Sequence, residues 1–191
     1  GEWHSWTWRH DSYELRGKTV GIVGGGAIGR MVMQRLQGWD CKLIYSDPYR
    51  MPEEMEKKLN CEYVSLETLL RESDVVSLHC PLTEQTRGMI GKEQLAMMKP
   101  NAIIVNEARG AVIDDKALVE ALQNGTVWGA AIDTWEKEPL DPNDPLVKME
   151  KVITTSHLGA ATRETVIRCF SIGYQNILRQ IHGEELVNRI V

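Results

Sequence analysis

The chain lacks several features that mark whole classes of protein. Over its 191 residues it has no apolar run near the ~18 residues that a membrane span requires, and its first residues show no signal-peptide pattern. No internal repeat or low-complexity tract appears. We therefore expect a cytoplasmic chain without a membrane partner, long enough to bury one good hydrophobic core.

The cysteines, histidines and basic residues also form no recognisable pattern. The four cysteines are scattered without a Cys-x-x-Cys pair, which predicts neither a disulfide framework nor a zinc site. Cys41 and Cys61 lie in apolar contexts typical of buried reduced thiols, and the five histidines are too dispersed to indicate a metal site. A formal net charge of -5, with no stripe of Lys and Arg beside an aromatic platform, argues against nucleic acid as a partner.

What the chain does have is a glycine-rich stretch between an apolar run and a predicted helix. Residues 18–23 predict a strand, Gly24-x-Gly-x-x-Gly29 follows, and residues 30–36 predict a helix. Gly24 permits a tight turn, Gly26 has no Cβ to keep a pyrophosphate from the backbone, and Gly29 lets the helix pack closely on the strand. The helix start offers free N–H groups and the positive end of its dipole to phosphates.

A second apolar run, residues 41–46, ends at Asp47, close to the spacing of about 20 residues expected for a ribose-binding acid. A carboxylate there accepts hydrogen bonds from ribose hydroxyls and repels a 2′-phosphate, which favours NAD over NADP. Two alternatives stay open: the glycine turn binds nothing, or Asp47 only caps a turn with Pro48. Arg50 lies close enough to weaken the preference for NAD.

The remaining chain alternates between strand-like and helix-like segments. We expect strands at residues 62–64, 74–78, 102–106, 127–133 and 151–155, and helices at 52–59, 66–71, 92–98, 115–123 and 162–181. Ser65 and Asp114 are the predicted N-caps of two of these helices. The alternation predicts an α/β fold, a doubly wound parallel sheet covered on both sides, with right-handed crossovers.

Polar side chains follow many of the predicted strands. Ligands of an open parallel sheet bind at the carboxyl ends of its strands, so these residues predict a site at one edge. The residues concerned are Gly24, Asp47, His79, Asn106 with Arg109, Asp133 and His157.

Six short sequence stretches follow one another in an order and at spacings that indicate a family. They are Gly24-x-Gly-x-x-Gly29 and residues 77–83, 98–100, 106–110, 133–139 and 157–162. Together they resemble the signature blocks of the D-isomer-specific 2-hydroxyacid dehydrogenases, of the phosphoglycerate dehydrogenase-like type, from Leu15 onward. The resemblance implies a nucleotide-binding lobe of the Rossmann type and a substrate lobe, with NAD and the reaction in the cleft between them. It also implies that most of the substrate lobe is absent here, so we expect the isolated chain to be inactive or weakly active.

The resemblance implies three catalytic residues. Oxidising a 2-hydroxy acid removes a proton from oxygen and a hydride from carbon, which requires a base near neutral pKa; His157 matches that base. Glu138 matches the carboxylate that favours the charged imidazole and fixes its tautomer, and Arg109 matches the fork that grips the substrate carboxylate. Taken singly, the three could be a core histidine, a solvated acid and a turn cap, and Glu136 lies two residues from Glu138.

The resemblance also implies the cofactor contacts. Ala27 and Ile28 are expected to offer backbone N–H groups to the pyrophosphate, Pro81 to line the adenosine, Ala108 to meet the nicotinamide ribose, and Asp133 to accept the carboxamide. His79 is expected near the cofactor without a catalytic role. The full expected set of cofactor-binding residues is Gly24, Gly26, Ala27, Ile28, Gly29, Asp47, Pro81, Ala108, Arg109, Asp133 and His157.

Three positions depart from the family's usual pattern. Ser156 stands where proline commonly precedes the histidine, which loosens that backbone. Glu107 places an acid beside Arg109, where it could compete for the guanidinium or repel an anionic substrate. Trp39-Asp40 replaces Phe-Gly, and aspartate tolerates the left-handed conformation better than most residues.

We expect three segments in the chain. Residues 1–16, with Trp3, Trp6 and Trp8, form an interdomain and dimerisation arm; residues 17–160 form the NAD-binding domain; and residues 161–191 form a returning helix and tail of the substrate lobe. A homodimer is expected through the arm.

Two classes of function compete. The first is an NAD-dependent oxidoreductase acting on a small anionic D-2-hydroxy acid or 2-oxo acid, with 3-phosphoglycerate slightly preferred over lactate and hydroxypyruvate. The alternative is an NAD(H)-sensing interaction protein of the same fold, like the C-terminal-binding corepressors. Formate dehydrogenase also shares the fold, but it carries glutamine where Glu138 stands.

Overall fold

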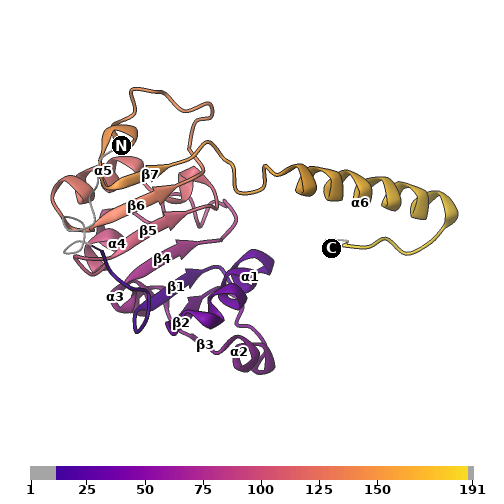
Figure 1. The fold of residues 1–191 in the computed structure, drawn as a ribbon, viewed down its shortest axis with the longest axis horizontal. Helices are drawn as coiled ribbons and strands as arrows, with labels where there is room; N and C mark the ends of the chain where they lie inside the picture. The colour runs from indigo at the N-terminus through magenta and orange to yellow at the C-terminus, as the bar shows by residue number, and fades with distance from the viewer. Residues whose placement is uncertain (1–11, 189–191) are drawn as a thin grey trace.

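A computed structural model describes residues 12–188. A twisted sheet with helices on its faces forms the main body, and one long helix extends away from it (Figure 1). The predicted arm falls largely at residues 1–11, so its three tryptophans lie outside the described residues.

The sheet has seven parallel strands in the order β3-β2-β1-β4-β5-β6-β7, as the doubly wound prediction requires. In register, Val23 of β1 pairs with Ser46 of β2 on one side and with Leu78 of β4 on the other. The carboxyl ends of neighbouring strands are therefore level at one edge. The strands are β1 (Thr19–Val23), β2 (Lys42–Ser46), β3 (Cys61–Tyr63), β4 (Val75–Leu78), β5 (Ile103–Asn106), β6 (Gly129–Ile132) and β7 (Val152–Thr154).

Within residues 12–188, six α-helices and three short 3₁₀ segments connect and follow the strands. Both predicted N-caps are confirmed: Ser65 Oγ accepts the Thr68 N–H at 3.1 Å, and the Asp114 carboxylate accepts two N–H groups of the helix that it begins. The helices are α1 (Ala27–Arg35), α2 (Glu53–Leu59), α3 (Leu66–Glu72), α4 (Lys92–Met97), α5 (Asp115–Gln123) and α6 (Arg163–His182). The 3₁₀ segments are η2 (Leu36–Gly38), η3 (Gly110–Val112) and η4 (Pro145–Lys148).

The core lies on both faces of the sheet because alternate strand residues point to opposite sides. On β2, Leu43 and Tyr45 belong to a buried cluster that also includes Met33 of α1. Ile44, between them, belongs to the larger cluster on the other face, where α3, α4 and α5 contact one another in series. These two apolar layers hold β1 and β2 rigid beneath the strand ends.

Some expected boundaries and burials were wrong. The strand predicted at 127–133 is only Gly129–Ile132, because Val127 is buried in irregular backbone that turns out of α5. The helix after the glycine turn begins at Ala27, earlier than residue 30. Cys41 and Cys61 are only partly buried. We also expected both faces of the sheet to be covered. The described residues leave part of one face open, since Ile153 of β7 is 71% exposed.

The expectation for Asp40 is confirmed, since its φ of 52° lies in the left-handed region. Within residues 12–188, no helix has both the length and the apolar character needed to cross a bilayer. The longest helix, the 20-residue α6, has no buried residue.

Candidate active site

The glycine-rich turn has the shape that its sequence predicts. Gly24 has a φ of 105°, and a Cβ there would lie 2.7 Å from the backbone carbonyl carbon of His79. A Cβ on Gly29 would clash with the carbonyl oxygen of Gly24. Gly26 differs, because a Cβ at that position would meet nothing within 4 Å. The space beside Gly26 is open, as a phosphate approaching the backbone requires.

Helix α1 begins at this opening without a capping side chain. Gly26 is its N-cap, and no side chain accepts a hydrogen bond from the first turn. The N–H groups of Ala27 and Ile28 are therefore oriented toward the opening, with the positive end of the helix dipole behind them. The first turn carries no acidic side chain that would repel a phosphate. This donor set fits a dinucleotide pyrophosphate.

Asp47 lies just after β2 and bonds to the glycine turn. One carboxylate oxygen accepts the Gly25 N–H at 2.7 Å, and the other accepts the Tyr49 N–H at 2.8 Å. Each oxygen keeps a second lone pair, which can accept a ribose hydroxyl. The predicted ribose acid thus lies beside the predicted pyrophosphate site.

His157 and Glu138 form a direct pair. His157 Nδ1 lies 3.0 and 3.1 Å from the two carboxylate oxygens of Glu138. The hydrogen bond with His157, and next the one from the Trp135 N–H, hold the pKa of Glu138 below its usual value. Glu136, the competing acid, instead lies 3.5 Å from Arg87.

Arg109 lies in a loop that is held close to this pair. The buried Asn106 side chain accepts the Ala108 N–H and donates to the Arg109 carbonyl, both at 3.1 Å. A Cβ on Gly110 would overlap the backbone of Trp135, so glycine allows this loop to touch the segment that carries Glu138. The Arg109 guanidinium donates to the Ala108 carbonyl at 2.6 Å, which leaves most of its donors for a ligand.

Asp133, directly after β6, bonds to the loop that follows β7. Its carboxylate accepts bonds from the Thr155 hydroxyl and from the N–H groups of Leu158 at 2.8 Å and Gly159 at 3.0 Å. Burial raises the pKa of Asp133, but these hydrogen bonds outweigh it and the net shift is downward. The Asp133 carbonyl also accepts the His157 N–H at 2.8 Å. Asp133 therefore holds the loop that carries His157, whose φ of 58° is left-handed.

Arg109, Glu138 and His157 line one cavity of about 540 Å³ together with Arg87, Thr134 and Trp135. A second cavity of about 480 Å³ adjoins it through Glu138, His157 and Trp135. Pro81 is exposed in the loop after β4, and Ala108 is buried next to Arg109; neither lines these two cavities.

Four residues near this centre were missed by the sequence analysis. Arg87 and Thr134 line the cavity, Trp135 Nε1 donates to the Thr155 carbonyl at 2.9 Å, and the Thr155 hydroxyl bonds to Asp133. Only Thr134 and Trp135 carried a signal, because they directly follow Asp133 in a matched stretch.

Two buried polar atoms lack a hydrogen-bond partner within residues 12–188. They are His79 Nδ1, after β4, and Thr134 Oγ1, after β6. Burial holds the pKa of His79 below its usual value. Unpaired polar atoms at a strand edge are costly unless a ligand satisfies them. With the open glycine turn, they fit a polar ligand lying across the strand ends.

Comparison with known proteins gives one consistent result. Residues 1–159 match the family model described as "D-isomer specific 2-hydroxyacid dehydrogenase, NAD binding domain". A glyoxylate reductase of Korarchaeum cryptofilum is 47% identical over 182 residues, covering 94% of this chain and 54% of its own length. A D-3-phosphoglycerate dehydrogenase of Methanocaldococcus jannaschii is 43% identical over 185 residues, covering 96% of this chain and 34% of its own.

A solved structure, that of D-lactate dehydrogenase with NAD⁺ from Lactobacillus jensenii, superposes with a TM-score of 0.86 at 33% identity. The match covers 94% of this chain and 57% of that one. This chain therefore spans about half the length, or less, of the proteins that it resembles.

Proposed function

This chain belongs to the D-isomer specific 2-hydroxyacid dehydrogenase family, as its NAD-binding domain, and on that basis we propose that it serves hydride transfer between nicotinamide and a small 2-hydroxy or 2-oxo acid. One observation carries the proposal: the His157 imidazole is held by Glu138 in the same cavity as the Arg109 guanidinium. A proton-transfer group and a carboxylate-binding group then face one reacting carbon.

The roles follow from the hydrogen bonds of each group. Glu138 occupies Nδ1 of His157, which leaves Nε2 as the nitrogen that gives a proton to the substrate oxygen during reduction and takes it back during oxidation. Arg109 binds the substrate carboxylate and polarises the neighbouring carbonyl. The bound cofactor supplies or accepts the hydride.

The cofactor of this domain is NAD. We propose that the Ala27 and Ile28 N–H groups bind its pyrophosphate and that Asp47 binds the adenosine ribose. For the nicotinamide end we propose Ala108 and the segment around Asp133, with Pro81 on the adenosine side. The open space at Gly26 and the unpaired atoms of His79 and Thr134 support this path.

For the substrate, we place glyoxylate ahead of 3-phosphohydroxypyruvate, the oxidised form of 3-phosphoglycerate. Of the two relatives described above, the glyoxylate reductase shares the higher identity. In the cavity that the described residues line, Arg87 is paired with Glu136, which leaves the Arg109 guanidinium for a substrate carboxylate.

We further propose the division into arm, NAD-binding domain and returning segment at residues 1–16, 17–160 and 161–191, and a homodimer in the cytoplasm. The exposed α6 supports a separate role for the last segment. Sedimentation velocity over a range of concentrations tests the dimer, and a monomer at the highest concentration would count against it.

The deciding experiment is a kinetic panel of glyoxylate, pyruvate, hydroxypyruvate and 3-phosphohydroxypyruvate with NADH, using the full-length protein. We expect glyoxylate to have the highest kcat/KM. A phosphorylated substrate in first place would overturn the substrate order and leave the reaction class intact. NADH binding without reduction of any acid would instead favour the interaction-protein alternative.

A further inference from the structure

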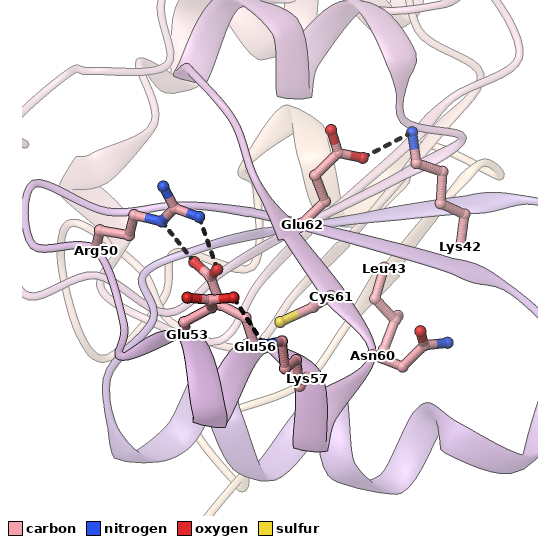
Figure 2. A pocket seen from close by; sticks show the side chains of 9 residues that line it. All are labelled: Lys42, Leu43, Arg50, Glu53, Glu56, Lys57, Asn60, Cys61 and Glu62. Carbon is pink, nitrogen blue, oxygen red and sulfur yellow. Dashed lines mark hydrogen bonds and ion pairs between the residues drawn. The ribbon is translucent and has the colours of Figure 1, made fainter.

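Arg50 lies next to the predicted ribose site but is engaged elsewhere. Figure 2 shows its guanidinium facing the carboxylate of Glu56 across the loop that enters α2. Nε lies 2.9 Å from one oxygen of Glu56, and a terminal nitrogen lies 2.8 Å from the other. This fork-to-fork geometry is the strong form of an arginine–carboxylate pair.

A buried hydrogen bond from Tyr45 also holds the Glu56 carboxylate. Its side chain is only 8% exposed, against 61% for Arg50, and it accepts the Tyr45 hydroxyl at 2.6 Å. Tyr45 is fully buried in β2, and its hydroxyl also accepts the Met51 N–H at 2.8 Å. Hydrogen bonds from Arg50 and then Tyr45 lower the pKa of Glu56 to about 2. Glu56 is therefore a fixed anion on α2, anchored to Tyr45 of β2.

A second contact relates Arg50 to the ribose acid. The guanidinium lies 5.5 Å from the centre of the Tyr63 ring, and the hydroxyl of that ring donates to the backbone carbonyl of Asp47 at 3.2 Å. Arg50 and Asp47 thus both contact the Tyr63 side chain. The pair with Glu56 holds the guanidinium toward α2, while the same Tyr63 side chain also bonds to the ribose acid.

We propose that Glu56 is a cofactor-selecting residue: by binding Arg50 with both carboxylate oxygens, it withholds the guanidinium from a 2′-phosphate and keeps the domain selective for NAD. An arginine near the ribose acid is the group with which related folds accept NADP. Asp47 repels the 2′-phosphate directly, and Glu56 removes the cation that would compensate. This inference rests on the proposed binding of the adenosine ribose beside Asp47.

The test is a mutant cycle read by equilibrium binding. NADH and NADPH are titrated by fluorescence into the full chain carrying Glu56→Gln, Arg50→Ala or both. Gln keeps the size of the side chain and an acceptor for Tyr45, but it releases the guanidinium. The matched control is Glu67→Gln, which frees Arg71 from an exposed pair on α3 with a separation of 3.0 Å.

We expect Glu56→Gln to raise the affinity for NADPH by about 3- to 10-fold, the gain of one partly exposed charged contact. NADH affinity stays within about twofold. Arg50→Ala alone leaves NADPH affinity unchanged, and in the double variant it cancels the gain. Glu67→Gln changes neither affinity.

Two results would overturn the inference: a folded Glu56→Gln variant without a gain for NADPH, or a loss of NADPH affinity in Arg50→Ala alone. If the Glu56→Gln variant does not fold, Glu56→Asp takes its place, because the shorter acid cannot reach both nitrogens. Failure of the unaltered chain to bind NADH would instead count against the proposed function.

Discussion

At the scale of single residues, His157 is the most direct test of the site. We expect His157→Ala to lower kcat by about 10²- to 10⁴-fold, the usual contribution of a general acid or base. NADH affinity should persist, because the pyrophosphate and ribose groups are untouched. His182→Ala, an exposed histidine at the end of α6, is the control. Turnover that is unchanged in steady-state assays of the full-length variant would remove His157 from the mechanism.

Glu56 gives a prediction for the pH dependence of stability. Its pKa falls from 4.5 to about 2 on folding, because Arg50 and then Tyr45 hydrogen-bond the charged form. The unfolded chain therefore binds this proton first, and the stabilisation is present above about 4.5 and lost as the pH falls toward 2. Urea midpoints should show a constant deficit for Glu56→Gln at pH 5 to 7 that shrinks below pH 4. A deficit that does not change with pH would mean that packing, not charge, holds the cluster.

At the scale of elements, the loop after β7 depends on a residue that follows β6. Asp133 accepts three hydrogen bonds from this loop with its carboxylate and one from the His157 N–H with its carbonyl. Those bonds hold His157 at a φ of 58°, a conformation that costs a non-glycine residue free energy. The looseness expected from Ser156 is therefore opposed by Asp133.

Asp133→Asn tests this role of the loop. We expect the free energy of unfolding to fall by about 1–3 kcal/mol, because an oxygen that accepts partly buried hydrogen bonds becomes an NH₂ group. The kcat should fall by about 10- to 100-fold through misplacement of His157, with a smaller effect on NADH affinity. Asp141→Asn, at an exposed acid, is the control. If NADH affinity falls more than kcat, Asp133 acts mainly on the nicotinamide carboxamide.

The sequence predicted local features better than contacts between elements. The glycine turn, the caps at Ser65 and Asp114 and the order of strands and helices depend on short-range geometry, and the structure confirms them. The sequence favoured Glu138 over the nearby Glu136, but the contacts of each acid could not be foreseen. In the structure Glu138 accepts the Trp135 N–H at 3.1 Å and pairs with His157, whereas Glu136 lies beside Arg87.

Other contacts left no trace in the sequence. Arg87 reaches the cavity from a separate loop, and no pattern near it indicates this. Thr155 bonds to an acid 22 residues away, which only the sheet brings close. The bidentate pair of Arg50 and Glu56 likewise depends on the loop before α2, which brings two side chains six residues apart face to face.

At the scale of the whole molecule, α6 is the element that the rest of the described chain leaves uncovered. It extends away from the sheet (Figure 1), and none of its residues is buried. A row of large apolar side chains, each more than half exposed, repeats along it at spacings of three and four: Ile167, Phe170, Tyr174, Ile177 and Ile181. Such a spacing forms one continuous face that suits packing against another element.

We expect this face to drive association of the chain or its binding to an apolar dye. Each side chain buried there contributes about 1.5–3 kcal/mol, so Phe170→Glu with Ile177→Glu should weaken association by on the order of 3 kcal/mol, roughly 100-fold in the dissociation constant. Arg168→Gln with Gln175→Glu lowers the net charge by the same two units on the opposite side of the helix and should change little. Analytical ultracentrifugation and dye fluorescence measure both effects. Equal behaviour of the two double variants would show that net charge, rather than the apolar row, controls association.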